Sequence, residues 1–131
     1  MAHFASQDSL KAFLNADQVA ALFSKIPVGQ QEAHYDYTDS LILSKTGEEP
    51  DETDNYPILV SIASRIVIWF LSGTQQWNDT NKPELDRREK LYKDALIELD
   101  AIASGEMPLD PSAEDTSGSE CGSEPRRTGS W

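Results

Sequence analysis

The hydrophobic residues near the start of the chain are spaced three and four positions apart, as they are on one face of a helix. This spacing predicts a short helix over Gln7–Leu14 and a second helix over Ala16–Ser24. Ser6 and Asn15 stand directly before these segments, and both are residue types that cap helices. A proline and a glycine within residues 26–29 then predict a break.

A longer helix is expected over about residues 30–45, with Gly47 at its C-terminal end. Its first half is polar and aromatic, whereas residues 41–43 are strongly apolar. We therefore expect the second half to face the core, and the first half is free to face away from its own subunit. The stripe expected on the inner side comprises Ala33, Tyr37, Leu41 and Ser44.

The most apolar segment, Pro57–Ser72, predicts the central helix of the fold, and its Trp69 and Phe70 are expected in the core. Its β-branched residues also permit a strand, but the segment is longer than a typical strand, and proline suits the first position of a helix. The last helix is expected over about Pro83–Ser104, with Gly105 as its stop. Its inner stripe comprises Leu85, Tyr92, Ala95, Leu96, Leu99, Ile102 and Ala103, and its outer face Asp86, Lys90, Lys93, Asp94 and Glu98.

These elements predict an all-α protein: a small helical bundle of two to three long helices plus short N-terminal helices. Residues 1–110 are expected to form this helical domain. Residues 111–131 are rich in Ser, Gly, Glu and Pro, and they have too few apolar residues to offset the entropy lost on ordering. We expect them to form an extended C-terminal arm that is shaped by a partner.

Charge narrows the range of partners. The chain has 131 residues and a net charge of −12, which argues against non-specific binding of nucleic acid. Its apolar segments are too short to cross a bilayer, and the start of the chain lacks the pattern of a signal peptide. A single cysteine excludes an internal disulfide, so a reducing compartment is expected. Residues 47–56 carry five acids and no base, namely Glu48, Glu49, Asp51, Glu52 and Asp54. These acids lack the spacing of a calcium loop, so we predict a solvated loop.

Candidate chemistry is sparse. The sequence lacks a nucleophile elbow, a Walker motif and a Gly-x-Gly-x-x-Gly motif, so we expect no enzymatic activity and no cofactor. A metal site built from His34, Asp36 and Asp39 is conceivable, but the spacing of these residues is loose and we predict no metal site.

Three further residues stand out because of their surroundings. Arg65 lies in the apolar helix and needs an acidic partner if it is buried, for which Asp39 is a candidate. Trp77 lies in a polar turn, where it forms either a lid on the bundle or a contact between subunits. Tyr35, on the polar half of its helix, is a second candidate for a subunit interface.

Several segments together form a family pattern. A helix ends with Asp39–Ile42, a loop leads to the proline-led helix, and the last helix carries Glu89, Tyr92, Ala95 and Leu99 before it ends in Ile102, Ala103, Gly105 and Leu109. Over residues 5–110, this pattern resembles the head–tail adaptor family of tailed phages, in particular its Mu-like branch of head-completion proteins. The loop after Lys45 departs from the family pattern because it is longer and acidic.

The resemblance implies a homo-oligomeric ring, usually a dodecamer, that lies beneath the portal protein and extends the DNA channel toward the tail. The expected partners are the portal protein, a tail-proximal neck or tail-terminator protein, other copies of the chain, and genomic DNA that passes without specific binding. The expected location is the virion neck, after assembly in the host cytoplasm. Arg126, Arg127 and Trp131 of the arm would then dock onto the portal.

The residues alone leave two other functions open. One is a small cytoplasmic helical protein-binding or regulatory module with an acidic disordered tail, and the other is an acidic mimic of DNA. The acidic loop could line the channel of an adaptor ring, where a negative wall would let DNA slide.

Overall fold

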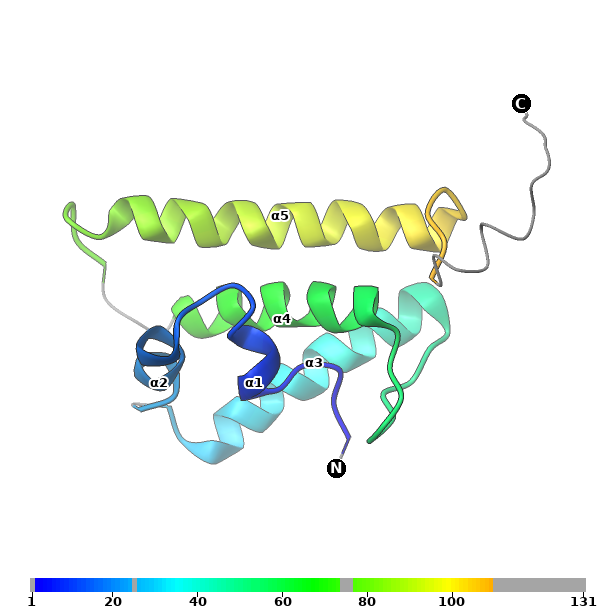
Figure 1. Cartoon of the computed structure of the whole chain (residues 1–131), viewed down its shortest axis with the longest axis horizontal. Helices are drawn as coiled ribbons and strands as arrows, with labels where there is room; N and C mark the ends of the chain where they lie inside the picture. The colour runs from blue at the N-terminus through cyan, green and yellow to red at the C-terminus, as the bar shows by residue number, and fades with distance from the viewer. Residues whose placement is uncertain (1, 25, 74–76, 110–131) are drawn as a thin grey trace.

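The computed structural model describes residues 2–24, 26–73 and 77–109. Within these ranges the chain forms five α-helices and no strand, which confirms the predicted all-α class (Figure 1). The helices are α1 (Gln7–Leu10), α2 (Ala16–Ser24), α3 (Val28–Thr46), α4 (Pro57–Ser72) and α5 (Lys82–Ser104). None of the described helices has the length and apolar character needed to span a membrane.

Reciprocal side-chain caps begin the two short helices. The Ser9 amide donates to Ser6 Oγ over 3.1 Å, and the Ser6 amide donates to Ser9 Oγ over 2.8 Å. Gln18 and Asn15 form the same arrangement before α2, with bonds of 2.8 and 2.9 Å. Each pair satisfies two amides that would otherwise lack a partner at the helix start. The first helix ends at Leu10, four residues earlier than predicted, because tighter i to i+3 turns replace it.

Glycine ends both long flanking helices, as predicted. Gly47 follows α3 with φ of 78°, and Gly105 follows α5 with φ of 86°. This left-handed conformation costs other residue types energy, because their Cβ would collide with the backbone. The α4 bounds agree with the predicted Pro57–Ser72, and Pro57 occupies the first turn.

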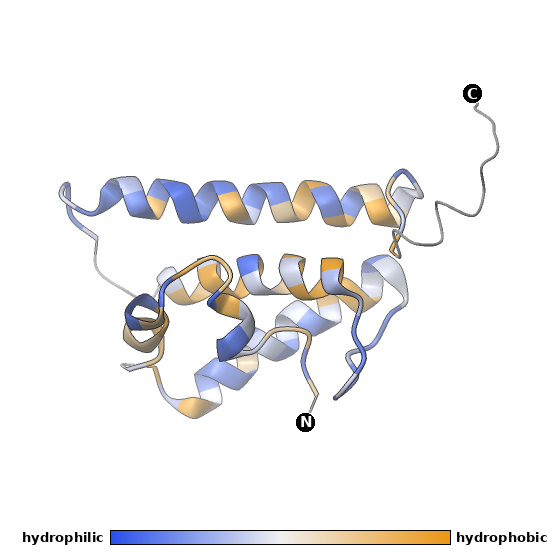
Figure 2. Ribbon diagram, viewed as in Figure 1, coloured by the Kyte–Doolittle hydropathy of each residue, from blue (hydrophilic) through white to orange (hydrophobic). Residues whose placement is uncertain are grey.

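The apolar helix α4 lies at the centre of the bundle. Helix α5 runs antiparallel to it along its whole length, α3 crosses its other side, and α1 and α2 pack near it (Figure 1). Leu59, Ile62 and Ile66 of α4 are completely buried. The amphipathic α5 alternates hydrophilic and hydrophobic positions along its length (Figure 2). Helix α4 therefore supplies more of the core than any other helix, and its neighbours pack around it.

The inner stripe predicted for α3 was wrong. Its buried residues are Tyr35, Thr38 and Ile42, whereas Ala33, Tyr37 and Ser44 are exposed and Leu41 is half-buried. The helix has no clear apolar face, so its packing partners decide which side turns inward. Burial of Thr38 is tolerated because its hydroxyl donates to the carbonyl of His34 over 2.8 Å.

The predicted partner of Arg65 was also wrong. The guanidinium of Arg65 donates two hydrogen bonds of 2.7 Å to the Glu98 carboxylate of α5. Its partner is therefore Glu98 and not Asp39. Glu98 was expected to face outward, but it is half-buried. The hydrogen bond from Arg65 lowers the pKa of Glu98 against the opposing effect of burial. The bidentate pair fixes the register of α5 against α4.

A second buried arginine, Arg88, was not anticipated from the sequence. It binds the Glu84 carboxylate over 2.8 Å and donates to Ser72 Oγ over 3.1 Å. The Trp77 ring lies 5.1 Å from its guanidinium carbon, and the indole N–H donates to the Ser72 carbonyl over 2.8 Å. These contacts place Trp77 against the end of α4, as expected for a lid on the bundle, and its predicted contact between subunits stays a prediction.

Candidate functional site

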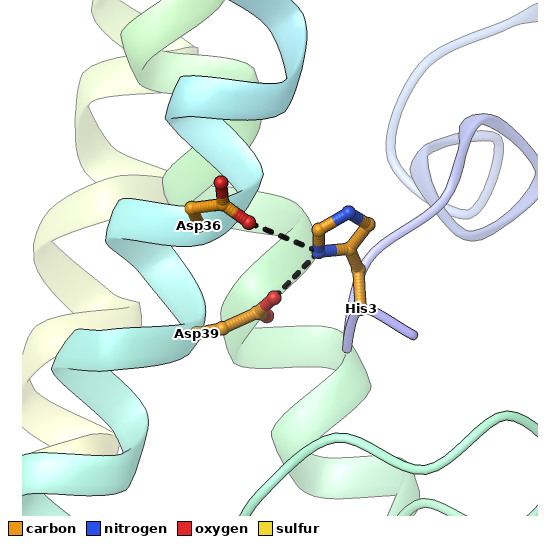
Figure 3. Close-up of side chains that lie close together, drawn as sticks. All are labelled: His3, Asp36 and Asp39. Carbon is orange, nitrogen blue, oxygen red and sulfur yellow. Dashed lines mark hydrogen bonds and ion pairs between the residues drawn. The ribbon is translucent and has the colours of Figure 1, made fainter. Parts of the chain in front are cut away.

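Residues 2–6, which precede α1 and which we call the strap, lie against α3. This contact brings one imidazole and two carboxylates together. Asp36 and Asp39 lie three positions apart on α3, so both face the strap. Nδ1 of His3 lies 2.6 Å from Asp39 Oδ2 and 3.9 Å from Asp36 Oδ1 (Figure 3). The Phe4 amide donates to the second oxygen of Asp39 over 3.1 Å. The Asp39 carboxylate is therefore bound from two sides by the strap.

The rest of the His3 ring is also held. Its Nε2 lies 3.3 Å from the Glu32 carboxylate, and its face stacks on Tyr35 with 5.0 Å between ring centroids. Only 11% of the His3 side chain is exposed. The imidazole therefore has one carboxylate at one nitrogen, two at the other, and an aromatic ring beneath it.

These surroundings shift two pKa values. Burial lowers the pKa of His3, but the hydrogen bonds and charges of Asp39 and Glu32 outweigh burial and raise it above the ordinary 6.5. Burial raises the pKa of Asp39, because the bonds from His3 and the Phe4 amide only partly offset the loss of solvent. The carboxylates therefore favour the imidazolium form of His3 more than solvent does.

We expect His3→Gln to lower the free energy of unfolding by about 1–2 kcal/mol at pH 5.5 and by much less at pH 9. The pKa of His3 is raised in the folded state, so its stabilising contribution is complete below the unfolded pKa. That contribution is lost as the pH rises through the folded-state pKa. Urea unfolding of both proteins at the two pH values, in buffer with EDTA, measures the difference.

His34→Gln is the matched control, because the chain has two histidines and His34 lies outside this cluster. The change in unfolding free energy that this variant shows at each pH value is subtracted from that of His3→Gln. If His3→Gln lowered the free energy of unfolding equally at pH 5.5 and pH 9, this would contradict a charged contact between the strap and α3.

The acidic loop lies beside the strap, across a cavity of about 450 Å³. Asp51 and Glu52 of the loop line this cavity together with His3 and Ser9. The Thr53 amide donates to the Asp51 carboxylate, and this bond is the main cause of the lowered pKa of Asp51. Glu49, Asp51, Glu52 and Asp54 are exposed and Glu48 is half-buried, in agreement with a solvated loop.

A row of aromatic rings crosses α3, α4 and α5. The Phe70 ring lies 6.0 Å from His34, 5.4 Å from Tyr37 and 5.7 Å from Tyr92, measured between centroids. Trp69 extends the row by stacking on Tyr92 at 5.9 Å. Trp69 and Phe70, which were expected in the core, are only half-buried, and Tyr37 is 58% exposed. We call these five side chains the aromatic row.

Tyr35, the other predicted candidate for a subunit interface on α3, does not join this row. Its ring is buried between His3 and Phe23 of its own chain. Burial and the nearby Glu32 charge raise the pKa of its phenol to about 12. His3 of the strap and Phe23 of α2 therefore cover this ring within its own chain.

The structure partly revises the predicted chemistry. His34, the histidine considered for a metal site, stacks on Phe70 of the aromatic row. The histidine that lies beside Asp36 and Asp39 is instead His3, near the start of the chain. Their three potential ligand atoms lie within 4.8 Å of one another. The proposed portal-docking residues Arg126, Arg127 and Trp131 lie outside the described residues.

Comparison with protein-family models, with curated proteins and with solved structures found no match. A functional proposal for this chain therefore rests on its own residues and geometry. Two surfaces stand out in the described part of the chain: the aromatic row and the carboxylate cluster around His3.

Proposed function

We propose that this chain is a structural head–tail adaptor of a tailed phage, which packs side by side with copies of itself into a ring beneath the portal. The order and ends of its helices support this proposal. Helix α3 carries the segment Asp39–Ile42 near its end, α4 begins at Pro57, and α5 ends at Gly105. These are the positions at which the family resemblance places the corresponding elements.

The aromatic row is the observation that carries the proposal. Its rings come from three helices and form one continuous set of contacts, yet none of them is fully buried. Aromatic residues offer large contact areas at little entropic cost and are enriched where proteins associate. A neighbouring copy that covers this row would bury it, and repetition of that contact closes a ring.

Charge assigns separate roles to the remaining surfaces. The acidic loop carries Glu48, Glu49, Asp51, Glu52 and Asp54, all but the first of them exposed. We propose that this loop faces the channel, where it would repel the phosphates of passing DNA. The arm with Arg126, Arg127 and Trp131 supplies residue types that often dominate binding at interfaces, and we assign it to the portal. No catalytic role is required of any residue in this proposal.

We expect Tyr37→Ala to leave the domain folded and to prevent ring formation. Tyr37 is mostly exposed, and its ring contacts Phe70 edge-on, so its loss costs the monomer little. An interface aromatic is commonly worth about 2 kcal/mol, and a ring repeats that loss at every contact. Electron microscopy of the chain mixed with the portal protein of the same phage measures ring formation.

Tyr56→Ala is the matched control, since Tyr56 is also exposed but lies outside the aromatic row. This variant should form rings as the parent protein does. Rings that form equally well with Tyr37→Ala would exclude the row as the subunit contact. A parent chain that stays monomeric with portal protein would instead favour the small helical binding module.

A further inference from the structure

We propose that His3, Asp36 and Asp39 form a binding site for a divalent first-row transition-metal ion, with Zn²⁺ as its representative ligand. The inference is independent of ring formation. One imidazole nitrogen and two carboxylate oxygens approach one another within 4.8 Å, from two segments of the chain that are far apart in sequence (Figure 3). The site is complete only when the strap lies on α3.

The distances suit an ion of this size. Zn²⁺ binds histidine nitrogen and carboxylate oxygen at about 2.0–2.2 Å, so its ligand atoms lie roughly 3–3.5 Å apart. His3 Nδ1 is 2.6 Å from Asp39 and 3.9 Å from Asp36, which brackets that range. Asp36 is 58% exposed, so its side chain can rotate toward the ion without disturbing the core.

Each buried ligand is already oriented by a further contact. The Glu32 carboxylate lies 3.3 Å from His3 Nε2, the nitrogen that faces away from the proposed ion. A carboxylate at this nitrogen is the usual support of a metal-bound histidine, because it fixes the ring and makes the other nitrogen more basic. The Phe4 amide similarly binds Asp39 Oδ1 and leaves Oδ2 facing His3.

The donor set also indicates the class of ion. An imidazole ligand favours Zn²⁺ and its neighbours in the first transition row, whereas Mg²⁺ and Ca²⁺ prefer sites made only of oxygen. Three protein ligands leave at least one position for water or for a ligand from another molecule. With His3 neutral, the two aspartates and Glu32 give the site a net negative charge that favours a cation.

A bound ion would tie the strap to α3, and this predicts a measurable effect on the whole chain. We expect Zn²⁺ to bind with one ion per chain and to raise the melting temperature by several degrees at saturating concentration. Isothermal titration calorimetry and thermal unfolding of the untagged full chain measure the two effects. All samples carry Cys121→Ser, since a thiolate is itself a strong Zn²⁺ ligand.

Two variants test the ligands and one serves as the control. Asp36→Asn should weaken Zn²⁺ binding at least about tenfold. It should lower the melting temperature of the metal-free protein only slightly, because Asp36 is exposed and its ion pair with His3 is long, at 3.9 Å. His3→Gln should abolish binding, and His34→Gln should leave it unchanged. Mg²⁺ should neither bind nor stabilise the parent protein.

Failure of the parent protein to bind Zn²⁺ would overturn the proposal, as would equal affinity in Asp36→Asn. Loss of binding in His34→Gln would place the ion elsewhere and have the same consequence. These outcomes do not depend on whether the chain forms rings, so the metal site and the adaptor function stand or fall separately.

Discussion

Replacing Ile66 with alanine is expected to reduce the free energy of unfolding by about 4 kcal/mol. Ile66 lies in the middle of the central helix α4 and is completely buried. Truncation removes its contacts and leaves a cavity that packed helices on several sides cannot easily close. Small domains are stable by only about 5–15 kcal/mol, so this single change removes a large part of the total. Urea unfolding followed by circular dichroism measures the loss.

Ile97→Ala provides a control of the same residue type in the neighbouring helix α5. Ile97 is 66% exposed, so its truncation removes few contacts and leaves no cavity. We expect a change within about 0.5 kcal/mol in the same experiment. Similar losses for the two variants would mean that α4 is not the centre of the core.

Glu98→Ala is expected to cost about 3 kcal/mol, the second largest effect. Its carboxylate accepts two bonds of 2.7 Å from Arg65, whose side chain is almost entirely buried. Removing the acid leaves a buried guanidinium without its charge partner, which typically costs 3–5 kcal/mol. The Glu98 side chain is 30% exposed, so water partly replaces it and the lower end of that range applies. The same urea unfolding experiment measures the loss.

Two comparisons separate this effect from ordinary surface pairing. Glu89→Ala removes an exposed partner of Lys93 at 3.7 Å and should change stability by less than about 0.5 kcal/mol. The double replacement Arg65→Met with Glu98→Leu should recover most of the loss, because it removes the buried charge together with its partner. A double variant no more stable than Glu98→Ala would show that the cost has another origin.

Local signals in the sequence were enough to place most helices. A helix cap depends on the few residues next to the end of the helix, so Ser6, Asn15 and Gly105 could be assigned from their neighbours alone. Helix α4 could be assigned with the same bounds because its apolar length and its leading proline leave few alternatives. The early end of α1 was missed, since Phe13 and Leu14 continue the apolar pattern although the backbone has already tightened into turns.

The candidate site was only half predictable. Asp36 and Asp39 stand three positions apart on one helix, so their shared face follows from the sequence. The histidine that joins them is 36 positions from Asp39, and nothing in the local pattern distinguishes His3 from His34. The aromatic row was equally hidden, because α3, α4 and α5 each contribute one or two of its rings.

By itself, the sequence determined the helical class, the caps and the central position of α4, because these depend on residues within a few positions of one another or on one long apolar run. Only the tertiary structure decided which acid neutralises Arg65, which side of α3 turns inward, and which histidine meets Asp39. Such choices depend on how rigid helices pack in three dimensions, where a shift of one helical turn exchanges one partner for another.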